Sequence, residues 1–314
     1  MSDAARGSSE VQDLGPVPDR LSLDAAAVAR LVADQFPQWA DRSVRPVRNG
    51  GWDNLTFHLG DDLLVRLPSA AEYALAVEKE HRWLPVLAGR VPVRIPSPVG
   101  LGSPAHGYPF PWSIYRWLPG ETVTPHSLTD PIGLAEDLAA FLAALQGVDV
   151  ADGPRPGIHN WYRGGTLRTY DTTAQAALHD LAGVIDVDTA AAAWTASLDA
   201  EWDGVDVWFH GDLAAGNLLV ADGRLTAVID FGTCGVGDPS CDLAVAWTLL
   251  GRSGRRVLRE RLGVDDATWS RGRGWALWKS LSQLAGAIDD GEVTARDRAR
   301  DVVERILADF GATR

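Results

Sequence analysis

The pattern of hydrophobic and polar positions in the first part of the chain predicts a helix followed by three strands. Apolar residues at helical spacing predict a helix over 22–38, and Asp24 near its start can cap the first turn. Short apolar runs separated by glycine-containing turns predict strands near 44–47, 55–59 and 63–67. These elements are short and lie close together in sequence, as expected for a compact unit.

A second helix and two more strands continue this pattern. Residues 71–88 are expected to be helical, and strands are expected near 97–101 and 111–117. Together with the first elements they indicate a small lobe of mixed α and β structure. Four residues of the second helix are expected in the core: Leu75, Trp83, Leu84 and Leu87.

The later part of the chain has mainly helical patterns. The segment 117–120, Trp-Leu-Pro-Gly, punctuates the sequence, and the Gly/Pro-rich stretch 151–165 is expected to be a loop. Helical structure is expected over three stretches: 131–146, 173–202 and 235–310. The predicted organisation has three parts: a disordered tail (1–20), an N-terminal lobe (21–117) and a C-terminal lobe (118–314).

The composition of the chain predicts a cytoplasmic protein. Hydrophobic residues make up 46% and charged residues 23% of 314 residues, which is ordinary for a globular protein. No apolar run is long enough to span a membrane, and the polar first twenty residues do not form a secretory signal. The two cysteines exclude a disulfide framework, so we expect a cytoplasmic protein with no membrane partner.

The net charge limits the classes of partner. The chain carries a formal charge of −13, whereas a nucleic-acid-binding protein needs a basic surface. Nucleic acid is therefore not an expected partner. The acidic balance is compatible with attraction of a cationic small molecule, but it is equally well explained by solubility alone.

Oxygen-bearing side chains gather in one short stretch, 207–246. Asp212 lies in the sequence His-Gly-Asp, Asn217 follows five positions later, and Asp230 comes thirteen positions after that, at the end of an apolar run. Mg²⁺ typically takes one or two carboxylates together with substrate phosphates. An upstream aspartate is then free to accept a proton from an attacking hydroxyl. The alternatives are a turn-capping Asp212 and an Asn217 that only holds the loop.

The motifs in this stretch resemble those of the aminoglycoside phosphotransferase family, which also includes macrolide, choline, homoserine and fructosamine kinases. The resemblance rests on His-Gly-Asp-Leu at 210–213 with Asn217, Ile-Asp-Phe-Gly at 229–232, and Gly-Asp-Pro at 237–239 followed by Asp-Leu-Ala at 242–244. It covers about 45–300. It implies the α+β class and a two-lobed protein-kinase-like fold, with a small mixed β-sheet N-lobe and a larger, mainly helical C-lobe.

The resemblance also implies roles for individual residues. Asp212 becomes the candidate catalytic base, and Asn217 and Asp230 the candidate Mg²⁺ ligands. Three residues are expected to support the catalytic loop: His210, Asp238 and Asp242. For His210 a direct general-base role is the alternative, and for Asp238 and Asp242 capping of a helix from 240 to 250 is a further expectation.

Residues of the small lobe are expected to hold the nucleotide. Gly50 and Gly51 lie between two predicted strands, where kinases carry a phosphate-binding loop, although a plain hairpin turn is the alternative. Arg66 occupies the strand position at which kinases have a lysine, and arginine also binds phosphate. Its expected helix partner is Glu80, with Glu78 as the rival.

The linker and the acceptor side are less constrained. Arg116 and Leu118 belong to the segment that matches the adenine-binding linker of kinases. Acceptor binding is expected from aromatic residues or from acidic ones, although core positions and a solvated turn explain them equally well. The candidates are Trp161, Trp247, Trp275 and Trp278, together with Asp289, Asp290 and Glu292.

These expectations describe an enzyme that transfers phosphate from ATP, or alternatively GTP, to a hydroxyl of a small molecule with Mg²⁺ as cofactor. An aminoglycoside-type antibiotic is the first expectation for the acceptor, and a macrolide or a metabolite is the alternative. A non-catalytic kinase-like binding protein competes with this reading because Arg66 replaces the usual lysine. A protein kinase is disfavoured because Gly-Asp-Pro follows Asp230 within eight positions. Oligomeric state is left open.

Overall fold

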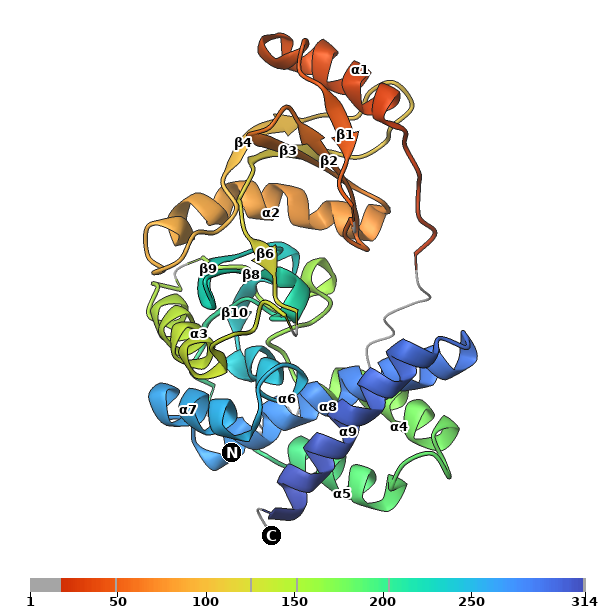
Figure 1. Cartoon of the computed structure of the whole chain (residues 1–314), viewed down its shortest axis with the longest axis vertical. Helices are drawn as coiled ribbons and strands as arrows, with labels where there is room; N and C mark the ends of the chain where they lie inside the picture. Colours follow the sequence, from red (N-terminus) through yellow and green to blue (C-terminus); the bar gives the residue numbers. More distant parts are fainter. Residues whose placement is uncertain (1–17, 49, 125, 151, 203, 313–314) are drawn as a thin grey trace, which may run out of the picture.

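The computed structural model describes residues 18–312 except 49, 125, 151 and 203. It has two lobes, with a β-sheet and two helices in the upper lobe of Figure 1 and helices dominating the lower one. The predicted fold class is therefore confirmed. Most of the expected tail, 1–20, lies outside the described residues.

The sheet of the small lobe has five strands in the order β1-β2-β3-β5-β4. All of its pairings are antiparallel, so the expected mixed lobe combines helices with a purely antiparallel sheet over the described residues. The strands are β1 (Val44–Pro46), β2 (Asn54–Leu59), β3 (Leu63–Pro68), β4 (Pro98–Gly102) and β5 (Trp112–Arg116).

Strand β3 separates a core face from a site face. Successive side chains of a strand point to opposite faces, so Leu63, Val65 and Leu67 share one side and Arg66 lies on the other. The three apolar residues are buried against helix α1 (Ala25–Gln35), which Asp24 caps through its carboxylate. Figure 1 shows α1 above the sheet and α2 below it. Arg66 is thereby directed towards the interlobe side.

Helix α2 (Ala71–Ala88) covers that second face and agrees with the predicted bounds. Leu84 and Leu87 are buried as expected, and Trp83 is half-buried. Leu75 was predicted to be buried, and this was wrong, because its side chain is 48% exposed. It lies on the outer side of α2, opposite the stripe that packs on the sheet.

The large lobe consists mainly of helices, which pack around a shared hydrophobic core. Its elements are α3 (Pro131–Gln146), α4 (Asp171–Asp180), α5 (Val187–Leu198), α6 (Val245–Thr248), α7 (Arg252–Leu262), α8 (Asp266–Asp289) and α9 (Val293–Ala312). The prediction for 131–146 is confirmed. The helix predicted over 173–202 is two helices, because Gly183 adopts a positive φ of 77° in the turn between α4 and α5.

Short strands carry the motif-bearing stretch. Strand β7 (Val207–Phe209) pairs with β10 (Gly235–Gly237), and β8 (Leu218–Ala221) forms a hairpin with β9 (Arg224–Val228) beside β6 (Glu121–Thr122). These strands lie directly beneath α2 in Figure 1. The loops that leave β7 and β9 are consequently positioned at the junction of the two lobes.

Candidate active site

The loop after β7 is held in one conformation by His210. The Nε2 of this buried ring donates to the carbonyl of Ile229 at 3.0 Å, and its Nδ1 accepts from the backbone N–H of Asp212 at 3.2 Å. Burial lowers the pKa of His210 below its usual value, so the ring is neutral near pH 7 and can donate with one nitrogen while it accepts with the other. This geometry agrees with the predicted supporting role.

Asp242 fixes the same loop from the other side. Its carboxylate accepts from the backbone N–H groups of His210 at 2.8 Å and Gly211 at 2.7 Å. Burial raises the pKa of Asp242 to about 7, although these two hydrogen bonds oppose the shift. Gly211 has a φ of 88°, and a Cβ there would lie 2.7 Å from the carbonyl oxygen of Thr233, so the motif requires glycine.

Asp238 joins this segment to α8. Its carboxylate accepts from the N–H of Ser240 at 3.0 Å and pairs with the guanidinium of Arg271 at 2.8 Å, with both charged groups buried. The expected helix from 240 to 250 is wrong as a single α-helix. Asp238 caps a 3₁₀ segment, Pro239–Ala244, which is followed by the short helix α6.

Asp212, the candidate catalytic residue, is contacted by two side chains. The Nδ2 of Asn217 donates to the Asp212 carbonyl at 2.9 Å and to its Oδ2 at 3.3 Å. Lys279 of α8 forms an ion pair with Oδ1. Burial alone would raise the pKa of Asp212, but the ammonium of Lys279 outweighs it and holds this pKa below the usual value. Asp212 is therefore ionised near neutral pH, as proton acceptance requires.

Asp230 has a backbone conformation that is unusual for an aspartate. It lies in the left-handed region, with φ 67° and ψ 67°, and its side chain is 36% exposed towards the cleft. Non-glycine residues in this region often occur at functional sites, where the surrounding structure maintains the strain. The strained turn presents the carboxylate to the interlobe space.

Asp230 and Asn217 fit a magnesium site that a nucleotide completes. Both line one interlobe cavity, and the amide oxygen of Asn217 is not used in any hydrogen bond among the described residues. No group of three or more His, Cys, Asp or Glu side chains in the described part of the chain is arranged to hold a metal. A carboxylate, an amide oxygen and nucleotide phosphates form the donor set that Mg²⁺ favours.

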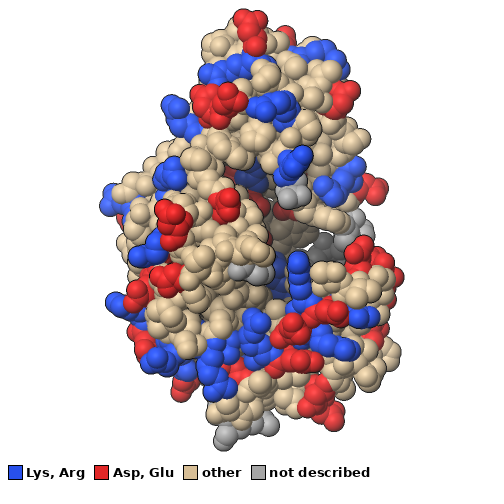
Figure 2. Space-filling view, in the orientation of Figure 1, with Lys and Arg blue, Asp and Glu red and all other residues tan. Residues whose placement is uncertain are grey.

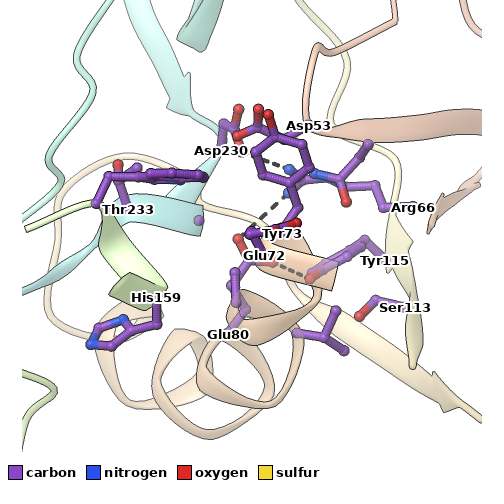
Figure 3. Close-up of a pocket in the computed structure, with 15 residues that line it drawn as sticks. Asp53, Arg66, Glu72, Tyr73, Glu80, Ser113, Tyr115, His159, Asp230 and Thr233 are labelled. Carbon is purple, nitrogen blue, oxygen red and sulfur yellow. Dashed lines mark hydrogen bonds and ion pairs between the residues drawn. The ribbon is translucent and has the colours of Figure 1, made fainter. Parts of the chain in front are cut away.

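Arg66 lies between the two lobes and contacts a carboxylate on each side. One of its nitrogens is 2.6 Å from Asp230 Oδ1 and another is 3.6 Å from Glu80 Oε1. The other oxygen of Glu80 accepts from the hydroxyl of Tyr115 on β5. Figure 3 shows this chain of contacts running from Asp230 through Arg66 and Glu80 to Tyr115. Glu80, and not its rival Glu78, is thus the partner of Arg66.

Most predicted nucleotide-binding residues line the same cavity. The free volume of this cavity is about 1250 Å³, including space that is open to solvent. Six of its lining residues have apolar side chains: Leu64, Pro96, Trp117, Leu118, Leu219 and Ile229. The predicted phosphate-side and linker residues also line it: Gly50, Gly51, Arg66 and Arg116. A lining that combines apolar and cationic side chains suits a nucleotide, which has an apolar base and anionic phosphates.

Lys79, next to Glu80 on α2, was not identified from the sequence. Its buried ammonium donates to the carbonyls of Gly232 at 2.6 Å, Cys234 at 3.1 Å and His159 at 3.3 Å. It therefore ties a helix of the small lobe to the loop that follows Asp230. A lysine within a charged helical sequence gives no sign of this, because only the tertiary contact buries it.

Asp53 was also missed as a site residue. It lies beside the Gly50-Gly51 loop and lines the cleft together with Arg66 and Asp230 (Figure 3). Burial and the nearby charge of Asp230 raise the pKa of Asp53 to about 6, against the lowering effect of Arg66. A third carboxyl group is thus present where nucleotide phosphates are expected.

A second pocket opens beside Asp212. Its free volume is about 620 Å³, including space that is open to solvent, and the polar or aromatic residues that line it include Arg163, Asp212, Trp275, Trp278, Lys279 and Gln283. Trp275 and Trp278 thus lie where an acceptor is expected. Trp247 is a core residue with 0% exposure, and Trp161 lines the cleft beside Tyr73 instead. Asp289, Asp290 and Glu292 are exposed at the turn between α8 and α9 and do not line this pocket.

The lobes and these contacts define the class of protein. A five-stranded lobe with the Arg66–Glu80 pair lies above a helical lobe that carries Asn217 and Asp230 at the cleft and Asp212 next to Asn217, which is the arrangement of protein-kinase-like folds. Within that class the chain belongs to the phosphotransferase enzyme family, whose model matches residues 43–275.

Curated relatives match part of the chain. An aminoglycoside 3'-phosphotransferase from Escherichia coli is 29% identical over 153 residues, which are 42% of this chain and 50% of that protein. An aminoglycoside 3'-phosphotransferase from Salmonella typhimurium is 37% identical over 60 residues, 18% of this chain and 22% of that protein. The chain therefore spans half or less of the length of these relatives.

Solved structures match nearly the whole chain. A solved structure described as a complex with GDP and kanamycin superposes on this chain with a TM-score of 0.67 at 22% identity. The superposition covers 90% of this chain and 98% of the chain in that complex. A macrolide 2'-phosphotransferase from Brachybacterium faecium superposes with a TM-score of 0.55 at 22% identity, covering 89% and 97%. At this level of identity the similarity shows the fold.

Proposed function

We propose that this protein transfers the γ-phosphoryl group of ATP to a hydroxyl group of a small molecule with the help of Mg²⁺. The observation that carries the proposal is the position of Asp212. It lines a pocket that can admit an acceptor, and it is hydrogen-bonded to Asn217, which lines the interlobe cavity together with Asp230. An ionised aspartate in an acceptor pocket next to a nucleotide cavity is what phosphoryl transfer requires.

Each residue has a defined task in this reaction. Arg66, held by Glu80, contacts the nucleotide phosphates. Asn217 and Asp230 would hold Mg²⁺, which would neutralise phosphate charge when bound. The acceptor oxygen forms a bond to the γ-phosphorus while its proton passes to Asp212, the bond to the β-phosphate oxygen breaks, and ADP leaves. The transition state is loose, so orientation of the hydroxyl by Asp212 contributes more than base strength.

The names of the relatives support this class of reaction and two acceptor types. They are described as aminoglycoside and macrolide phosphotransferases. GTP is the alternative donor, because one of the superposed structures is described as a GDP complex. Under this proposal the substitution of Arg66 for lysine retains a phosphate contact and does not make the protein a passive nucleotide binder.

The test is the variant Asp212→Ala, with the exposed Asp289→Ala as control. We expect kcat for phosphate transfer to fall by roughly 10²–10⁴-fold, the range for loss of a positioned general base, with the Kd of Mg·ATP little changed. Product formation by mass spectrometry and ATP consumption are measured across aminoglycosides, macrolides and small alcohols.

Near-normal transfer by Asp212→Ala would contradict the mechanism. Binding of Mg·ATP without phosphorylation of any acceptor would instead indicate a binding protein.

A further inference from the structure

The pocket beside Asp212 is unusual in its charge. Among its lining residues Asp212 is the single carboxylate, and it is already paired with Lys279. Arg163 is a second cation in the same lining. A molecule with several positive charges would meet two cations here and no free carboxylate, even though the whole chain carries a net charge of −13.

Arg163 is held in place by aromatic side chains. Its guanidinium carbon is 4.7 Å from the ring centre of Trp278, 5.1 Å from that of Tyr170 and 5.3 Å from that of Trp275. One nitrogen donates to the hydroxyl of Tyr170 at 2.5 Å, and this hydroxyl donates to the carbonyl of Trp161. The side chain is thereby fixed before any ligand binds.

The backbone before Arg163 is constrained as well. Trp161 and Tyr162 have φ angles of 53° and 56°, in the left-handed region that non-glycine residues rarely adopt. The strain is located at the turn that delivers Arg163 to the pocket. Such conformations persist when the surrounding structure enforces them, and they concentrate at functional sites.

The guanidinium also retains unused binding capacity. Arginine has five N–H donors, and within the described part of the chain Arg163 forms no ion pair and only the one side-chain hydrogen bond to Tyr170. Its positive charge still acts on Asp212, lowering the pKa of that carboxyl together with Lys279. A fixed guanidinium with free donors is suited to a carboxylate or a phosphate.

We propose that Arg163 determines acceptor specificity and that the acceptor is a hydroxyl compound bearing an anionic group, a carboxylate or a phosphate ester, and not a polycation. This inference rests on the proposed phosphotransferase function. The anionic group pairs with Arg163, the carbon skeleton packs against Trp278, and the reacting hydroxyl reaches Asp212. The γ-phosphoryl group then passes to that hydroxyl as described above.

The test compares four acceptors with one skeleton: glucose, glucosamine, glucuronate and glucose 6-phosphate, with kanamycin as a polycation. For the wild type with Mg·ATP we expect kcat/KM to be at least about 10-fold higher for an anionic sugar than for glucose, and lowest for glucosamine and kanamycin. Comparison of glucuronate with glucose 6-phosphate distinguishes the carboxylate from the phosphate source.

Arg163→Gln and Arg163→Lys separate recognition from catalysis. We expect Arg163→Gln to raise KM for the anionic sugar about 10-fold or more and to raise KM for glucose much less, and Arg163→Lys to restore part of the affinity for the anionic sugar. Efficient phosphorylation of kanamycin by the wild type, or an equal rise of KM for every acceptor in Arg163→Gln, would overturn the proposal.

A binding measurement keeps the inference testable apart from turnover. Calorimetry with the Mg·ADP-saturated protein should detect glucuronate or glucose 6-phosphate binding that Arg163→Gln weakens about 10-fold or more, and an absence of such binding to the wild type overturns the inference. The proposed function fails separately, if product formation is the same in Asp212→Ala as in the wild type.

Discussion

At the scale of single residues, the cleft is organised by charges that offset one another. Arg66 contacts Asp230 and Glu80, and Lys279 contacts Asp212. The Asp230 and Glu80 carboxylates raise the pKa of Arg66 above its usual value despite burial, so its charge is permanent. An arginine can therefore stand where kinases use lysine, with a planar group in place of a point charge.

We expect Asp53 to make nucleotide binding depend on pH. Its pKa of about 6 means that the carboxyl is mostly charged at pH 7.5 and mostly neutral at pH 5, and the charged form repels phosphate. We predict that Asp53→Asn binds ADP roughly 10-fold more tightly than the wild type at pH 7.5, as expected for relief of about 1.4 kcal/mol of repulsion, and equally at pH 5. Kd values from fluorescence titration at both pH values check this.

The other charged groups near Asp53 must be considered when the pH dependence of ADP binding is interpreted. They are Asp230, Arg66, Asp212 and Arg20. Asp53→Asn retains all four, so pH dependence that persists in the variant belongs to them or to the nucleotide. Weaker ADP binding by Asp53→Asn at pH 7.5 in the presence of Mg²⁺ would contradict repulsion and indicate that Asp53 helps to hold the cation.

At the scale of elements, α2 links the two lobes through adjacent side chains. Glu80 reaches Arg66 on β3, while Lys79 reaches the carbonyls of Gly232 and Cys234 beyond Asp230. Successive residues of a helix point about 100° apart, which lets one turn of α2 contact the sheet and the large lobe together. The position of Asp230 is thus coupled to that of the helix.

Removal of the Lys79 contact should loosen this coupling. We predict that Lys79→Met lowers the free energy of unfolding by about 2 kcal/mol, because charge-assisted hydrogen bonds are lost and buried carbonyls remain without a donor. Urea unfolding measures this loss. The neighbouring exposed Glu78→Gln is the matched control and should change stability by less than about 0.5 kcal/mol. Equal effects of both substitutions would show that Lys79 has no special role.

At the scale of the whole molecule, the proposed nucleotide site is shared between lobes. Figure 2 shows the face hollowed between the upper and lower parts of the molecule, with basic side chains at the hollow. Residues of the sheet, the linker and the large lobe all line the cavity, so a bound nucleotide contacts both lobes. None of the helices in the described residues is long and apolar enough to cross a membrane.

Nucleotide binding should therefore stabilise the entire fold. A ligand at 100 times its Kd contributes about 2.7 kcal/mol to the folded state. Each kcal/mol raises Tm by about 2–4 °C in a domain of about 150–250 residues and by less in a longer chain, so we expect a rise of several degrees. We predict that Mg·ATP raises Tm by at least about 2 °C in the wild type and by clearly less in Asp230→Asn. Thermal unfolding followed by fluorescence measures both. An equal shift in the two proteins would exclude Asp230 from nucleotide or metal binding.

Much of the arrangement could be predicted because it depends on local sequence. The bounds of α2 and α3 follow from helical spacing and from Pro131 at the first position of α3. The spacing of Asp212, Asn217 and Asp230 indicated the large-lobe half of the cleft before any contact was known. Leu75 shows the limit of such reasoning, since periodicity alone did not distinguish the inner from the outer side of α2.

The sequence by itself determined the family, the fold class that the family implies, and the candidate residues Asp212, Asn217 and Asp230, because short motifs of local sequence carry them. Only the tertiary structure decided which distant residues meet them: Lys79, Tyr115, Arg163 and Lys279. Each is separated from its partner by tens of residues along the chain, and a lone cation or tyrosine has no local signal for a partner. Burial, charge pairing and the chemistry of the acceptor pocket arise when packing brings the two together.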